Sequence, residues 1–121
     1  MRRHCPAVCV CGGFSEWLKI QALASSFGVM TMPHVWGSGI ALAAALHSLA
    51  AIPPSPHTAN PIALQNEPVV EFDRTHNPLR DELLHEQFVA VLDQGALLVP
   101  SGPGLGVKVN EKVLSKYRAE G

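Results

Sequence analysis

A histidine and a glutamate each lie at the end of a short apolar segment, where acid–base chemistry is common in α/β proteins. His34 comes directly after residues 29–33 (VMTMP), and Glu71 lies near the end of residues 68–72 (PVVEF). If these segments are parallel strands, ligands meet the chain at their C-terminal ends. Histidine titrates near neutral pH, so His34 is a candidate general base. The alternatives are a His34 that hydrogen-bonds a loop and a Glu71 that orders a loop or forms a salt bridge.

The other histidine and cysteine motifs have a structural interpretation. His47 lies within an apolar stretch and is predicted to be a packed histidine with one hydrogen-bond partner. Three cysteines beside His4 have the spacing C-x3-C-x-C, which lacks the paired C-x2-C of structural zinc sites. They are Cys5, Cys9 and Cys11, and we interpret them as reduced thiols rather than as a zinc site or a disulfide framework.

Two further motifs resemble binding sites but predict none. The sequence GPGLG at 102–106 has the wrong spacing for a phosphate-binding loop and contains a proline, so it predicts a turn. Four acidic residues in the polar segment after residue 72 predict a solvated face: Asp73, Asp81, Glu82 and Glu86.

The elements that would position His34 and Glu71 alternate between strand and helix. We predict a short strand at 2–7, a helix at 15–27, a strand at 29–33, a helix at 40–52 and a strand at 68–72. Ser15 is the predicted N-cap of the first helix, and Gly28 its stop signal. The second helix is apolar nearly all round, so it should be covered on most sides. The alternation indicates parallel βαβ units and an α/β fold.

The pattern changes after residue 73. Residues 53–67 form a loop rich in Pro, Ser and Asn, and the later segment predicts a helical turn within 79–87, short strands at 88–92 and 96–99, and a helix at 111–118 capped by Asn110. Three parallel strands with two helices would expose unpaired sheet edges. The sequence therefore predicts a piece of a larger α/β structure.

Composition argues against several classes of protein. The chain has 121 residues and a formal net charge of −1, and its nine Lys and Arg residues do not cluster, so no nucleic-acid partner is expected. The longest strongly apolar run, residues 40–52, is shorter than the ~20 residues that span a bilayer, so no membrane association is expected. The N-terminus lacks the long apolar core and cleavage site of a signal peptide. We expect a cytoplasmic protein.

The sequence resembles the mandelate racemase/muconate lactonizing enzyme family of the enolase superfamily. The resemblance is carried by CGGFSEWLKIQALASSFGVMTMPHVWGSGIALAAALH, and NPLRDELL and VPSGPGLGVKVN resemble the tail of acid-sugar dehydratases in that group. It implies the C-terminal part of a (β/α)7β TIM-type barrel. Residues 1–72 would supply about the last three strands and two helices, and residues 73–121 a tail that packs on the α+β capping domain.

The resemblance also implies a chemistry and a substrate class. Such proteins remove a proton next to a carboxylate, and a magnesium ion stabilises the enediolate that forms. His34 matches the family's general base, and Glu71 matches an acid that hydrogen-bonds the substrate carboxylate in some members. Ala7 stands where the family has an aspartate that pairs with the histidine. The family's magnesium ligands and lysine base have no counterpart here, so we expect no cofactor in this chain alone.

Three hypotheses follow for the function. The first is a truncated, split or degenerate family member, inactive alone, whose parent reaction is magnesium-dependent dehydration of an acid sugar or racemisation of a related hydroxy acid. The second is one half of a split enzyme that needs a complementing chain. The third is a non-catalytic binding module, which an unpaired sheet edge and an apolar helix would favour.

Overall fold

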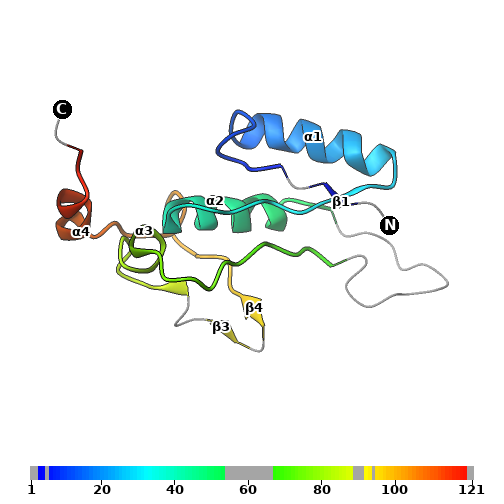
Figure 1. Cartoon of the computed structure of the whole chain (residues 1–121). Coiled ribbons are helices and arrows are strands. Elements are labelled where there is room, and N and C mark those ends of the chain that lie inside the picture. Colours follow the sequence, from blue (N-terminus) through cyan, green and yellow to red (C-terminus); the bar gives the residue numbers. More distant parts are fainter. Residues whose placement is uncertain (1–2, 5, 54–66, 89–91, 94, 120–121) are drawn as a thin grey trace.

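A computed structural model describes residues 3–4, 6–53, 67–88, 92–93 and 95–119 of the chain. Within these ranges the elements are, in chain order, β1 (Arg3–His4), α1 (Phe14–Ser26), β2 (Met30–Thr31), α2 (Gly39–Ala50), α3 (Pro78–Asp81), β3 (Leu92–Asp93), β4 (Ala96–Leu97) and α4 (Glu111–Lys116). Figure 1 shows α1 and α2 side by side in the N-terminal half and α4 at the opposite end. Among the described residues, no helix has the length and apolar character needed to cross a bilayer.

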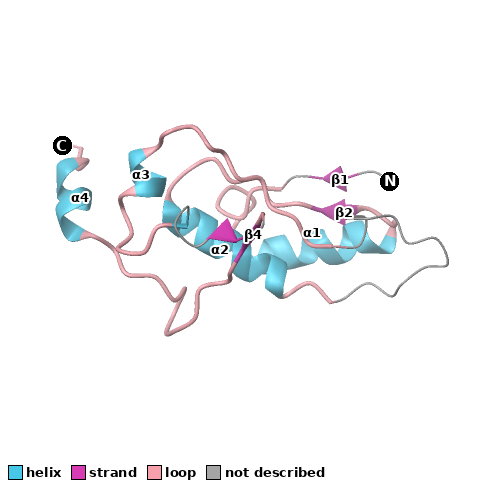
Figure 2. Cartoon of the chain, turned by 90° about the horizontal axis from the view of Figure 1, so that it is seen from below, coloured by secondary structure: helices cyan, strands magenta, loops and turns pink. Residues whose placement is uncertain are grey.

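The first three elements form a βαβ unit. β1 pairs with β2 in parallel, with Arg3 opposite Met30 and His4 opposite Thr31. Figure 2 shows the two strands side by side and pointing the same way. A parallel pair needs a crossover, and α1 with its flanking turns supplies it. The parallel arrangement predicted from the alternating pattern is therefore confirmed for this unit, although each paired strand is only two residues long.

The N-cap predicted for α1 is wrong by two residues, and the helix begins and ends one residue earlier than the predicted range 15–27, whereas the Gly28 stop signal is correct. Gly13 is the N-cap, with φ 89°, and its carbonyl accepts the first helical bond from the Trp17 amide; Ser15 lies within the helix. At the other end Gly28 has φ 64°, and the Val29 amide bonds back to the Ala24 carbonyl at 2.9 Å. This pattern is a Schellman motif, in which glycine adopts the left-handed conformation at low cost.

α2 forms the core, as its nearly continuous apolar sequence predicts. Ser38 caps it by accepting from the Ala41 amide, and eight of its residues are buried. Leu42 and Leu46 pack with residues from the later part of the chain, Leu84 and Phe88. Burying a leucine side chain stabilises a fold by roughly 1.5–3 kcal/mol, so these contacts help to hold the later part of the chain against α2.

The strand predicted at 68–72 is wrong as a paired strand. Residues 69–72 are partly buried, yet within the described part of the chain residues 68–72 make no ladder with β2 or another segment. A strand requires a neighbouring backbone at hydrogen-bonding distance, and an apolar run alone does not provide one. Most of the predicted loop 53–67 and of the strand 88–92 falls on residues 54–66 and 89–91, which lie outside the described residues.

The C-terminal segment folds back along α2. β3 and β4 form an antiparallel hairpin, and the bridge between Leu84 and Val109 brings the segment after α3 against residues that precede α4. Asn110 caps α4 by accepting from the Lys112 amide, as predicted.

The start of α2 lies very close to α3. A Cβ atom at Gly39 would lie 2.8 Å from Leu84 Cδ1 and 3.0 Å from the Arg80 carbonyl oxygen. A side chain at this position would therefore push α3 away from α2, so glycine is needed for the close approach rather than for its backbone angles.

We predict that Gly39→Ala destabilises the chain by about 1–3 kcal/mol, because it overpacks this contact. Gly37→Ala is the control, since a Cβ there meets only Ala41 Cβ at 3.8 Å. Urea unfolding of the two variants measures the effect. Alanine stabilises an unconstrained helix relative to glycine by up to about 1 kcal/mol, so a gain in stability from Gly39→Ala would contradict the tight contact.

Candidate functional site

His34 and Glu71 meet across 37 positions of sequence. The imidazole Nδ1 is hydrogen-bonded to Glu71 Oε2. His34 follows β2 directly after Pro33, which is fully buried and anchors the end of that segment. Both side chains remain partly open to solvent, with 48% of the His34 side chain and 40% of the Glu71 side chain exposed. The two residues singled out from the sequence therefore form one site.

The direction of this hydrogen bond fixes the chemistry available to the imidazole. An ionised carboxylate only accepts, so the proton between the two groups belongs to His34 Nδ1. In the neutral ring, Nε2 is then the nitrogen with a free lone pair. A carboxylate that selects the tautomer and holds the ring plane is a common support for a histidine that transfers protons.

The pair lies in an open cleft of about 580 Å³. Its walls come from two short stretches, residues 34–36 and 71–73, together with Thr75. Trp36 is 79% exposed, and Phe72 contributes a partly buried ring on the opposite stretch. The volume lies within the range of small-molecule sites in proteins.

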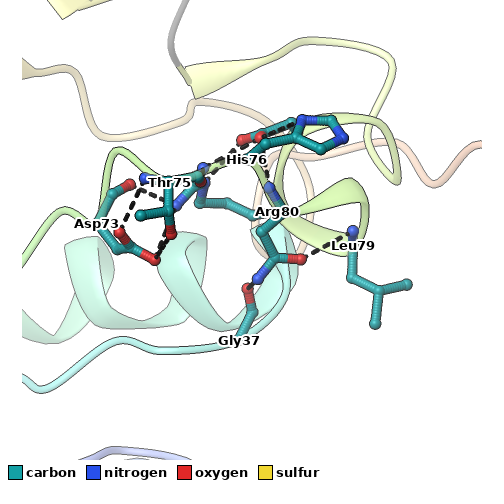
Figure 3. Close-up of polar contacts among 8 residues, drawn as sticks. Gly37, Asp73, Thr75, His76, Leu79 and Arg80 are labelled. Carbon is teal, nitrogen blue, oxygen red and sulfur yellow. Dashed lines mark hydrogen bonds and ion pairs between the residues drawn. The ribbon is translucent and has the colours of Figure 1, made fainter.

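Beside the cleft, a buried arginine organises the chain that follows Glu71 (Figure 3). Arg80 is only 6% exposed. Its guanidinium donates to the backbone carbonyls of Asp73 and Thr75 and, through Nε, to Asp81 Oδ1 at 2.7 Å. Asp73 Oδ2 lies 3.6 Å from Nη1. The guanidinium thus joins a loop to the helix that bears it.

The solvated face predicted for the acidic residues is wrong at Asp73 and Asp81. The side chain of Asp81 is only 18% exposed and that of Asp73 30%, because both face Arg80. The hydrogen bond from Arg80 lowers the pKa of Asp81 and, in return, raises that of Arg80. The pKa of Asp73 is lowered chiefly by hydrogen bonds from the hydroxyl and amide of Thr75. Glu86 is exposed, as predicted.

Sequence inspection missed Arg80 as part of the site. An arginine in a polar segment is usually solvated, and nothing in its spacing from Glu71 indicates burial. The one available signal in the sequence was the presence of two acidic residues near Arg80, Asp73 and Asp81. In the structure both carboxylates lie beside its guanidinium.

The remaining candidates lie outside the cleft. His47 Nε2 contacts the Leu105 carbonyl at 3.1 Å, which confirms its packing role. The GPGLG motif forms a turn, as predicted. Cys11 Sγ donates weakly to the Val8 carbonyl, and Cys9 is exposed. Cys5 and the His4 side chain lie outside the described part, so the cysteine interpretation stays a prediction.

A magnesium ion does not fit the residues described here. Magnesium needs several oxygen ligands in near-octahedral geometry. In the described ranges no three His, Cys, Asp or Glu side chains are grouped to hold a metal. His34 and Glu71 supply one carboxylate and one imidazole, and they are bonded to each other.

Comparison with known proteins gives consistent matches over nearly the whole chain. The family described as enolase C-terminal domain-like matches residues 4–113. D-galactarolactone cycloisomerase of Agrobacterium fabrum is 50% identical over 113 residues, which cover 93% of this chain and 28% of that protein. Arabinonate dehydratase of Saccharolobus solfataricus is 33% identical, covering 90% of this chain and 25% of that protein.

The fold is shared with part of a longer solved structure. The crystal structure of 3,6-anhydro-D-galactonate cycloisomerase from Zobellia galactanivorans superimposes with a TM-score of 0.73 at 36% identity. The match covers 98% of this chain and 29% of that one. The chain therefore spans less than a third of the length of each of these proteins.

We predict that acid weakens the fold through Asp81. Its pKa is lowered below the ordinary 3.8 by the Arg80 hydrogen bond, so the stabilisation is present above that value and is lost as the pH falls through the lowered pKa. Asp81→Asn should cost about 1.5–3 kcal/mol at neutral pH, as expected for a hydrogen bond to a charged group, and should flatten the stability profile below pH 4. Urea unfolding as a function of pH measures both effects.

The control for this prediction is Glu86→Gln, which removes an exposed carboxylate outside the Arg80 contacts. It should leave the acid profile unchanged. If the stability of Asp81→Asn fell with decreasing pH as steeply as that of wild type, the Arg80–Asp81 pair would not be the cause of the acid sensitivity.

Proposed function

Since the chain belongs to the enolase C-terminal domain-like family, we propose that it forms the histidine-bearing part of an acid-sugar dehydratase or cycloisomerase active site. The observation that carries the proposal is the His34–Glu71 hydrogen bond at the cleft. The resemblance to the mandelate racemase/muconate lactonizing enzyme group is confirmed, and the two relatives described above are named as a cycloisomerase and a dehydratase.

In this proposal His34 transfers a proton at the carbon beside a carboxylate. Neutral His34 accepts that proton on Nε2, the nitrogen that Glu71 leaves free, and the protonated ring later returns it to the substrate or to a departing hydroxyl group. Glu71 holds the tautomer and stabilises the imidazolium that forms. A positioned general acid–base group of this kind contributes typically 10²–10⁴-fold to a rate.

The Glu71 contact also bears on Ala7. The resemblance places an aspartate partner of the histidine at that position, and this chain has a methyl group instead. Glu71 supplies a carboxylate to Nδ1 from the other side of the cleft. We therefore assign Glu71 to the imidazole rather than to a substrate carboxylate.

The finer architecture is part of the same proposal. β1 and β2 correspond to the sixth and seventh strands of a (β/α)7β barrel, and residues 73–121 to the tail that returns to a capping domain. Residues 68–72 take the place of the eighth strand, although they do not pair with β2 in the described part of the chain. In this proposal, magnesium and its carboxylate ligands are supplied by the part of the enzyme that this chain does not match. That part is either in the same polypeptide or in a separate one. No step assigned to His34 or Glu71 passes through the metal.

A second candidate, assembly with a complementing chain, is favoured by the surface of α1. Among its residues only Trp17 is buried. Apolar side chains on or next to the helix are exposed instead: Val10, Phe14, Leu18, Leu23 and Phe27. This much exposed apolar area marks an interaction surface, and the parallel β1–β2 pair offers a sheet for further strands.

The role of His34 can be tested in a chimeric enzyme. This chain replaces the aligned segment of the Agrobacterium fabrum D-galactarolactone cycloisomerase, and the chimera should turn over D-galactarolactone. His34→Gln should lower kcat by about 10²–10⁴-fold. Glu71→Gln should lower it less, about 10-fold, because the amide oxygen still accepts from Nδ1 without the charge.

The matched control in the chimera is Glu86→Gln, which should leave kcat unchanged. A His34→Gln chimera with full activity would contradict the proposal, and so would a folded wild-type chimera without turnover.

We also predict that the purified chain alone does not turn over D-galactarolactone with added magnesium. Co-expression with the remaining part of the same relative should give a complex on size-exclusion chromatography, and Leu23→Asp should prevent it by charging the exposed face. Ser15→Asp, at an exposed polar position of the same helix, is the control. Separate elution of the two wild-type chains would refute complementation, and turnover by the single chain would refute its inactivity.

A further inference from the structure

Arg80 contacts the residues that immediately follow Glu71 in the chain. Its guanidinium carbon lies 5.7 Å from the centroid of the Phe72 ring. Its two terminal nitrogens donate to the carbonyls of Asp73 and Thr75. In Figure 3 the Arg80 side chain reaches from its helix toward Asp73 and Thr75. The backbone after Glu71 is thus held at two carbonyls and one ring by a single buried side chain.

The same short helix also contacts the segment that carries His34. The side-chain Nδ2 of Asn77, at the N-cap of α3, donates to the Gly37 carbonyl at 3.4 Å, a long hydrogen bond. The Arg80 carbonyl lies against Gly39, where the close packing described above leaves no room for a Cβ atom. α3 therefore touches the chain three to five residues after His34 and one to four residues after Glu71.

We propose that Arg80 is a positioning residue for the His34–Glu71 pair, holding the two segments in register from α3. This inference rests on the proposed function only in assigning the pair a role in proton transfer, since the hydrogen bond itself is present in the structure without substrate. Asn77 is a weaker second tie. Neither residue lines the cleft, so neither touches the reacting atoms.

The chemistry of the contact requires a guanidinium. Arg80 uses Nε, Nη1 and Nη2 at once, toward one carboxylate and two carbonyls that lie in different directions. A lysine ammonium carries the same charge as a point and cannot span these three acceptors. Without the guanidinium, the carbonyls of Asp73 and Thr75 lose their donor. The backbone between Glu71 and Asn77 is then free to move away from His34.

The test reads the hydrogen bond directly. Long-range ¹H–¹⁵N spectra of the 121-residue chain show which imidazole nitrogen carries the proton, and loss of signals in His34→Gln assigns the ring. Wild type should show His34 protonated on Nδ1. Glu71→Ala should lose this Nδ1–H signature and gives the reference for a broken pair.

Arg80→Lys is the main variant, and it should lose most of the Nδ1–H signature while circular dichroism shows a folded chain. Asn77→Ser is the second variant. Serine still caps the helix but is too short to reach the Gly37 carbonyl, so a partial loss is expected. Asn110→Ser makes the same exchange at the N-cap of α4 and should keep the wild-type spectrum.

A folded Arg80→Lys variant with the wild-type signature would overturn the proposal. If Arg80→Lys does not fold, Asn77→Ser decides: a partial loss supports the proposal and an unchanged spectrum overturns it. Equal losses in Asn77→Ser and Asn110→Ser would also overturn it, because they would reflect helix capping alone. The measurement uses no substrate, so its failure is distinct from loss of turnover in the chimera.

Discussion

A guanidinium that is almost completely removed from water must have its donors satisfied, and this requirement at Arg80 organises the C-terminal half of the structure. Burying a charge is costly unless it is paired and hydrogen-bonded. Here the partners are one carboxylate on α3 and two backbone carbonyls from the loop before it. Satisfying them bends residues 73–77 around the arginine. Asp73 and Thr75 then form their own hydrogen-bonded turn.

The backbone held by Arg80 is only a few residues from the candidate site. Glu71 lies two residues before the first carbonyl that Arg80 holds, and it faces His34 across the cleft. Pro33 and Thr31, both buried, anchor the opposing segment. The pair is therefore supported from both sides by buried groups while the imidazole stays half-exposed. Such an arrangement suits a group that must keep one orientation and still reach a ligand.

The two long helices have opposite relations to solvent. α2 is covered on most sides, by Leu84 and Phe88 among others, and α1 buries only Trp17. A helix of 13 residues with that little burial is not stabilised by the described chain alone, since most helical stability in proteins comes from packing. This exposed face of α1 is the surface proposed above for contact with a complementing chain.

The sequence by itself determined the features that depend on near neighbours. The Gly28 stop, the Asn110 cap and the apolar character of α2 each arise from interactions within about four residues, and local patterns report these reliably. His34 could be singled out because its residue type and its position after an apolar segment are also local properties. The resemblance to the family was carried by continuous motifs in the same way.

Only the tertiary structure decided what depends on the path of the chain. The contact of His34 with Glu71 joins positions 37 apart, and no local pattern specifies which carboxylate a histidine will meet. Arg80 is buried because the loop before it closes around its side chain, and no local pattern around residue 80 indicates this burial. Residues 68–72 have the composition of a strand but pair with nothing described. Pairing and burial are set by which segments fold next to one another, and a sequence fixes these only through the sum of its distant contacts.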